Sequence, residues 1–111
     1  MQIECEGWWV QDFFGKQPME PLVLEFRDGV INGTGNDIVG QFTMSGFVKE
    51  GAVEIDKRYL GQHAARYIGQ FDGEGNMQGT WHIGELSGPW AIHMRGNSHI
   101  HSELHEIREI S

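Results

Sequence analysis

The length, composition and charge of the chain restrict the kind of protein it can be. Its 111 residues, 39% of them apolar, suit one globular domain, and sixteen glycines beside three prolines favour short strands joined by tight turns over a helical bundle. The net charge of -8 argues against binding to nucleic acid or to an anionic membrane surface. Because neither a signal peptide nor a membrane-spanning stretch is visible and Cys5 is the single cysteine, we expect a soluble, cytoplasmic protein.

The first half of the chain reads as four short strands that begin near residues 8, 21, 30 and 37. Two-residue turns fix which residues of neighbouring strands lie opposite each other. A turn at residues 28–29 is expected to place Phe26 opposite Ile31. A turn at residues 35–36 is then expected to place Ile31 opposite Gly40.

Four more strands are predicted to begin near residues 52, 64, 77 and 89. The connections that precede them are expected at residues 50–51, 61–63, 72–76 and 86–87. These connections set four cross-strand pairs: Met44 with Lys57, Tyr59 with Ala65, Gly69 with Gly79, and Ile83 with Trp90. Eight antiparallel strands in up-and-down order close naturally into a barrel.

Apolar side chains stay on one face of the predicted strands through every one of these turns. The residues expected to point into the barrel are Leu22, Leu24, Phe26, Ile31, Ile38, Phe42, Met44, Val48, Val53, Ile55, Tyr59, Tyr67, Phe71, Met77, Trp81, Ile83, Trp90, Ile92 and Met94. We therefore predict an all-β protein, with a single small antiparallel up-and-down barrel of about eight strands over residues 1–96.

Residues 97–111 are predicted to form a tail outside the barrel, with a short C-terminal helix. Its apolar residues recur at near-helical spacing: Ile100, Leu104, Ile107 and Ile110. The same tail contains the histidine-rich sequence HIHSELH. No single regular structure brings its three histidines together, so we predict no metal site.

Two motifs at the ends of the barrel sequence resemble those of a known group of proteins. Gly7-Trp8-Trp9 supplies a glycine-x-tryptophan at the start of the first strand, and Arg95 supplies a basic residue at the end of the last strand. In these features the chain resembles the calycin-like barrels, the group of lipocalins and fatty-acid-binding proteins with avidin as a further relative. The resemblance implies that Trp9 faces inward and that Arg95 packs over it in a cation–π contact that closes one end of the barrel.

Gly69 and Gly79 stand where inward core side chains are expected, and two interpretations of them remain open. In the first, glycine provides only the sharp coiling that a small barrel needs. In the second, the glycines also leave space for a ligand between Tyr67, Phe71 and Trp81.

The inward face also carries the residues expected to bind a ligand. Lys57 is predicted to face inward opposite Met44 and Tyr67, where its ammonium needs a carboxylate from the protein or from a ligand. Alternatively, its long stem carries the charge out to the barrel mouth. We predict a small apolar or weakly anionic ligand with Lys57 at its polar end. The other predicted ligand-binding residues are Phe42, Met44, Tyr59, Tyr67, Gly69, Gly79, Trp81 and Trp90.

The alternative function is that of a filled barrel acting as a homo-oligomeric structural or protein-interaction module. It is favoured by apolar residues predicted to face outward: Val23, Val39, Phe47 and Ile68. The sequence shows no nucleophile with a base, no paired inward carboxylates and no glycine loop in a βαβ context, so we predict neither catalytic residues nor a cofactor.

Overall fold

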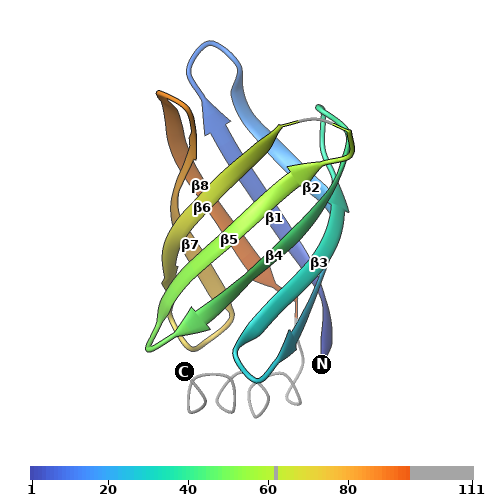
Figure 1. Cartoon of the computed structure of the whole chain (residues 1–111), viewed down its shortest axis with the longest axis vertical. Helices are drawn as coiled ribbons and strands as arrows, with labels where there is room; N and C mark the ends of the chain where they lie inside the picture. The colour runs from blue at the N-terminus through green and yellow to red at the C-terminus, as the bar shows by residue number, and fades with distance from the viewer. Residues whose placement is uncertain (62, 96–111) are drawn as a thin grey trace.

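The computed structural model describes residues 1–61 and 63–95, which form one closed barrel of eight antiparallel strands (Figure 1). The strands are β1 (Gln2–Gln11), β2 (Gly15–Arg27), β3 (Val30–Asn36), β4 (Gln41–Lys49), β5 (Ala52–Tyr59), β6 (Ala64–Phe71), β7 (Asn76–Ile83) and β8 (Leu86–Met94). Each strand pairs with the next along the chain, and β1 pairs with β8 to close the barrel. The predicted all-β up-and-down barrel is therefore confirmed, and it is compatible with a calycin-like fold.

Two expectations from the sequence concern helices: one is predicted in the C-terminal tail, and none is expected to span a membrane. The predicted helix in the tail 97–111 lies outside the described residues. Within the described residues, no helix is of the length and hydropathy that a membrane span requires.

The barrel interior is formed by the alternating apolar residues of every strand, as the sequence pattern predicts. Ile38 is the clear exception, because it lies in the turn after β3 and is 64% exposed. The interior also includes residues that the prediction omitted: Ile3, Cys5, Met19 and Ala65. The first two were missed because β1 begins at Gln2 and not near residue 8.

Several turns lie away from their predicted positions. The turn at residues 28–29 does place Phe26 opposite Ile31. The predicted turn at residues 35–36 is wrong, because β3 continues to Asn36 and Ile31 lies opposite Gly46 instead of Gly40. The chain turns at residues 37–40 instead.

The two later loops are also displaced. Lys57 lies opposite Ala65, and Tyr67 lies opposite Ile55, so the predicted pairs of Tyr59 with Ala65 and Lys57 with Tyr67 are wrong. In the last hairpin Ile83 pairs with Leu86 and not with Trp90. These shifts are all by an even number of residues, so each side chain stays on its predicted face of the sheet.

Gly69 and Gly79 lie opposite each other where two strands approach closely. A Cβ atom at Gly79 would lie 1.8 Å from the carbonyl oxygen of Ile68, and one at Gly69 would lie 2.0 Å from that of Gln78. The same atom at Gly69 would lie 2.8 Å from the ring of Trp90, which fills the adjacent interior. The glycines therefore allow the close approach of β6 and β7, and the ring of Trp90 occupies the interior directly beside Gly69.

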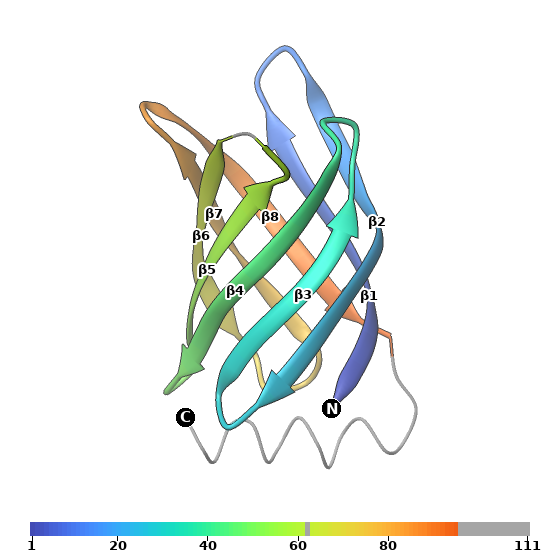
Figure 2. The same ribbon diagram turned by 45° about the vertical axis from the view of Figure 1, so that its right-hand side comes forward.

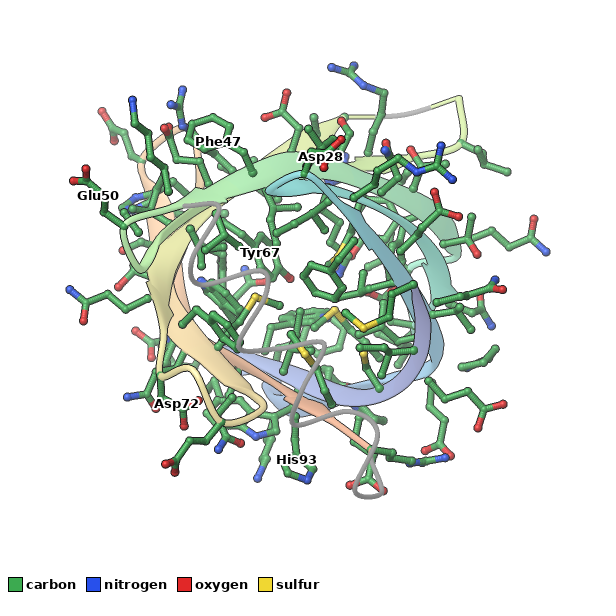
Figure 3. The ribbon with its side chains drawn as sticks, turned by 90° about the horizontal axis from the view of Figure 1, so that it is seen from below. Asp28, Phe47, Glu50, Tyr67, Asp72 and His93 are labelled. Carbon is green, nitrogen blue, oxygen red and sulfur yellow. The ribbon has the colours of Figure 1, made fainter. Side chains whose placement is uncertain are left out.

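The barrel has two distinct ends (Figures 1 and 2). The upper end carries the loops between β1 and β2, β3 and β4, β5 and β6, and β7 and β8. The lower end carries the N-terminus and the three tight turns that join the remaining neighbours. Figure 3, viewed from the lower end, shows the interior filled by side chains, among them several with sulfur atoms. The described structure places its buried charged groups and its apolar pocket towards the upper end.

Candidate functional site

A buried pair of opposite charges lies near the upper end of the barrel. The ammonium Nζ of Lys57, a residue only 1% exposed, lies 2.6 Å from Oδ2 of Asp37. The same carboxylate oxygen accepts hydrogen bonds from the hydroxyl of Tyr59 at 2.7 Å and from Nε1 of Trp9 at 3.1 Å. The carboxylate that a buried Lys57 requires is thus supplied by the protein, and the expectation that its charge escapes to the mouth is wrong.

The turn between β3 and β4 places Asp37 in this position. Oδ1 of Asp37 accepts hydrogen bonds from the backbone amides of Val39 at 2.9 Å and Gly40 at 3.4 Å. The backbones of Asp37 and Gly40 also bond to each other in both directions, at 3.1 Å each. Gly40 has a φ of 146°, which side-chain-bearing residues rarely adopt. One carboxylate oxygen therefore holds the turn, while the other reaches into the barrel.

Aromatic rings surround the ammonium of Lys57. Its Nζ lies 4.3 Å from the ring centre of Phe42, 4.9 Å from that of Tyr59 and 5.5 Å from that of Trp9. It also donates a hydrogen bond to the hydroxyl of Tyr67 at 3.2 Å. Cation–π attraction strengthens as water is removed, so these rings offset part of the cost of burying the charge.

The surroundings of the pair shift the pKa values of its members. Burial lowers the pKa of Lys57 to about 8, although the hydrogen bond and the charge of Asp37 oppose this. Burial alone would raise the pKa of Asp37, but the hydrogen bonds from Lys57 and Tyr59 and the charge of Lys57 hold it below its ordinary value. Burial and the neighbouring Asp37 carboxylate raise the pKa values of Tyr59 and Tyr67 well above normal. The raised pKa values favour the protonated form of both phenols, and the lowered pKa of Asp37 favours its carboxylate form.

An apolar pocket of about 300 Å³ opens beside this pair at the upper end. We call it the upper pocket, and its lining residues are Trp9, Gln11, Val39, Tyr59, His63, Ala65, Tyr67, Trp81, Ile83 and Leu86. Most of these side chains are aromatic or aliphatic, which is typical of sites for small molecules. Apart from the tyrosine hydroxyls and the tryptophan indoles, the polar side chains of the lining are those of Gln11 and His63.

The structure brings only part of the predicted ligand-binding set to this pocket. Tyr59, Tyr67 and Trp81 line it, and Lys57 lies buried beside it in contact with both tyrosines. The other predicted residues do not line it: Phe42, Met44 and Trp90 are packed in the core, and Gly69 and Gly79 lie at the close approach of β6 and β7.

Packing contacts fix the tryptophans in the wall of the upper pocket. Nε1 of Trp81 donates a hydrogen bond to the backbone carbonyl of Val10 at 2.9 Å. The rings of Trp9 and Trp81 meet edge to face with centres 6.2 Å apart, and Phe14 lies 5.8 Å from Trp9. Gly88 makes room for this arrangement, because a Cβ atom there would lie 2.9 Å from Nε1 of Trp81.

The predicted contact between Arg95 and Trp9 is wrong, although Trp9 does face inward. Trp9 lies opposite Trp90, whereas Arg95 follows β8 at the lower end of the barrel. The guanidinium of Arg95 bonds to the exposed Glu6 carboxylate at 2.9 Å. The cation that lies over Trp9 is instead the ammonium of Lys57.

The sequence did not predict Asp37, or most of the aliphatic residues that line the upper pocket, as part of the site. Asp37 follows Gly35-Asn36, where a two-residue turn was expected, so it appeared to be an ordinary strand residue. The signal that points to it is indirect: an inward Lys57 requires a carboxylate, and aspartate is common at the start of turns because its side chain bonds the backbone two residues further on. His63 was assigned to a loop and its contribution to the mouth was not foreseen.

Across residues 1–61 and 63–95, no cluster of three or more histidine, cysteine or acidic side chains is arranged to hold a metal ion. The histidine-rich sequence of the tail lies outside that part of the chain. Comparison with protein-family models, with curated proteins and with solved structures found no match to this chain.

Proposed function

We propose that the protein binds a small, uncharged and largely apolar molecule in the upper pocket. The observation that carries this proposal is the pocket itself, a space of about 300 Å³ walled by Trp9, Tyr59, Tyr67 and Trp81. Towards the lower end of the described barrel, buried side chains fill the interior. Aromatic and aliphatic walls with few polar groups favour an apolar guest.

The size of the pocket limits the ligand. A volume of about 300 Å³ equals roughly ten water molecules at about 30 Å³ each, so we expect a ligand of about ten to seventeen non-hydrogen atoms. At roughly 0.5 kcal/mol per atom, such a ligand gains about 5 to 8 kcal/mol. Dissociation constants between about 1 and 200 µM follow from that range.

The charge state of the pocket region favours a neutral ligand over an anionic one. The ammonium of Lys57 is already paired with Asp37 at 2.6 Å and is bonded to Tyr67. A ligand carboxylate would have to compete with a carboxylate that the fold holds in place, and its own burial would be costly. A polar group on the ligand is better placed at Gln11 and His63 in the lining.

The test is a titration with N-phenyl-1-naphthylamine, an uncharged fluorescent probe, with 1-decanol as a competitor. The wild-type chain should enhance the probe's fluorescence with a micromolar dissociation constant, and decanol should displace it. Ala65→Phe, which places a ring in the pocket, should weaken binding at least tenfold. Met44→Leu is the matched control, because Met44 is buried in the core away from the pocket and the change conserves volume.

Equal binding of the probe by wild type and Ala65→Phe would contradict the proposal, provided that the melting temperatures of these two proteins differ by only a few degrees. So would a loss of binding in Met44→Leu alone, since that would place the ligand in the core.

A second candidate function, self-association through the barrel wall, is favoured by one observation. Val30 and Phe47 lie opposite each other on β3 and β4, and both are exposed, at 47% and 44%. Figure 3 shows Phe47 on the outer wall. Such a pair is the start of an apolar contact surface. Sedimentation velocity of wild type and Phe47→Ser tests it: a dimer lost in the variant supports it, and a monomer at all concentrations contradicts it.

A further inference from the structure

Exposed apolar side chains encircle the mouth of the upper pocket. They come from all four upper loops or the strand ends beside them, and we call them the apolar rim: Phe13, Phe14, Ile38, Val39, Leu60 and Leu86. Phe13 is fully exposed and has a φ of 69°, so its backbone adopts an unusual conformation at the tip of the longest hairpin. Val39 and Leu86 also line the pocket, so rim and pocket form one continuous apolar surface.

The shape and size of the rim bear on what could cover it. Its residues stand on separate hairpin tips that project from the upper end (Figures 1 and 2). The six exposed side chains offer roughly 600 Å² of apolar surface. That area is below the ~800 Å² per partner of a standard protein interface, and separate tips do not provide a continuous complementary face. A fluid lipid layer can surround each hairpin tip separately, whereas a folded protein partner needs a continuous complementary surface.

The exposed charges around the rim balance one another. At the upper end the exposed acidic Asp12 and Glu85 are balanced by the exposed basic Lys16 and Arg58. The lower end carries the exposed acidic residues Asp28, Glu50, Asp72 and Glu74, three of which are labelled in Figure 3, beside the exposed basic residues Arg27, Lys49 and Arg95. A surface docked on the rim therefore meets no excess of negative charge from the described residues around it.

We infer that the apolar rim docks on the surface of a lipid bilayer, with its hairpin tips inserted among the lipids and the mouth of the upper pocket facing the membrane. This revises the expectation from total charge, which took no account of where the charges lie. Projecting apolar side chains bind a bilayer through the area they bury, without the need for a basic surface. An apolar ligand could then pass between bilayer and pocket without crossing water.

Vesicle flotation with the full chain tests this inference without any pocket ligand. Wild-type protein should float with neutral phosphatidylcholine vesicles, and Phe13→Ser/Leu60→Ser should reduce the bound fraction about tenfold or more. Val30→Ser/Phe47→Ser is the matched control, because it removes two exposed apolar side chains from the wall and leaves the rim intact. It should float like wild type.

The salt dependence of vesicle binding and the position of Phe13 relative to the lipids provide two further tests. Binding should change little between low and high salt, because apolar insertion is not screened. On vesicle binding, Phe13→Trp should gain a blue-shifted emission component beyond that of the four native tryptophans in wild type, and brominated lipids should quench this added component. Ala65→Phe should still float, so that failure of the pocket proposal and failure of this one are distinguishable.

Several outcomes would overturn the inference. Wild-type protein that does not float would do so, as would equal loss of binding in the rim and wall variants. A dimer that Phe13→Ser/Leu60→Ser dissociates, with no flotation of wild type, would assign the rim to a second copy of the chain instead.

Discussion

Replacing Asp37 by asparagine should destabilise the barrel strongly, because the carboxylate serves two sets of donors at once. Oδ2 accepts from Lys57, Tyr59 and Trp9, while Oδ1 accepts from two backbone amides of the turn. An asparagine amide has one acceptor oxygen and one donor nitrogen. Whichever way it is oriented, its NH₂ group faces either the ammonium or the turn amides, and the ammonium loses its countercharge.

The expected cost follows from the burial of the pair. Lys57 is 1% exposed and the Asp37 side chain is 0% exposed, so loss of one charge leaves the other in an apolar interior. Breaking such a pair from one side costs about 3 to 5 kcal/mol. For a domain of this size each kcal/mol lowers the melting temperature by about 4 °C or more, so a decrease of at least ~12 °C is expected.

Urea denaturation of a double-mutant cycle measures the coupling. Lys57→Met alone should cost less, about 1 to 3 kcal/mol, because Asp37 keeps its phenol, indole and backbone donors. The double variant Asp37→Asn/Lys57→Met should show a coupling energy of about 2 kcal/mol or more. Asp72→Asn is the matched control, since that exposed carboxylate accepts from the turn amides of Glu74 and Asn76 but faces no buried cation. It should cost about 1 kcal/mol.

The reasoning would be refuted by an Asp37→Asn cost no larger than that of Asp72→Asn. It would also be refuted by a coupling energy below ~0.5 kcal/mol, since the ammonium would then not depend on Asp37.

Three further predictions concern the core, the thiol and the titration of the buried ammonium. Gly79→Ala should destabilise the barrel by about 3 kcal/mol or more in urea denaturation, because its Cβ atom would meet backbone at 1.8 Å; a neutral effect would contradict the close approach of β6 and β7. Cys5 is buried and burial raises the pKa of its thiol to about 12, so it should react with Ellman's reagent at pH 8 only through unfolding, and rapid reaction in the native state would show that it is accessible. The ¹³Cε resonance of Lys57 should titrate near pH 8 in the folded protein. Because this pKa lies below the ordinary lysine pKa of 10.5, the unfolded chain binds more protons than the folded chain between pH 8 and pH 10.5. The stability of wild type relative to Lys57→Met should therefore rise as the pH increases through that window, and a fall would reverse the assigned direction.

The sequence predicted the faces of the strands better than their registers. The alternation of apolar residues survives any shift by two, four or six residues, so the core around Leu24, Ile55 and Tyr67 was predicted correctly although three connections were displaced. Turn signals such as Asp28-Gly29 were reliable where the flanking strands also alternate. At Gly35-Asn36 the glycine-asparagine pair lies within a strand, and the actual turn depends on side-chain bonds of Asp37 that local sequence does not reveal.

The candidate site was predictable only in part, for a related reason. Tyr59, Tyr67 and Trp81 were assigned correctly to the interior because strand parity places them there. Whether an inward residue borders space or packing depends on distances across the barrel, which parity does not determine. Trp90 illustrates this: it lies inward as predicted, yet its ring fills the space over Gly69 that a ligand was expected to use.

The indole resonances of the four tryptophans provide the most direct test of the proposal that the upper pocket is a binding site. Trp9 and Trp81 line the pocket, whereas Trp8 and Trp90 do not, and each signal can be assigned by a Trp→Phe variant. Titration of ¹⁵N-labelled protein with N-phenyl-1-naphthylamine should shift the Nε1–H signals of Trp9 and Trp81 in a saturable way, and leave those of Trp8 and Trp90 nearly unchanged. A saturable shift confined to Trp90, or no shift of any indole at millimolar probe, would contradict binding in the upper pocket.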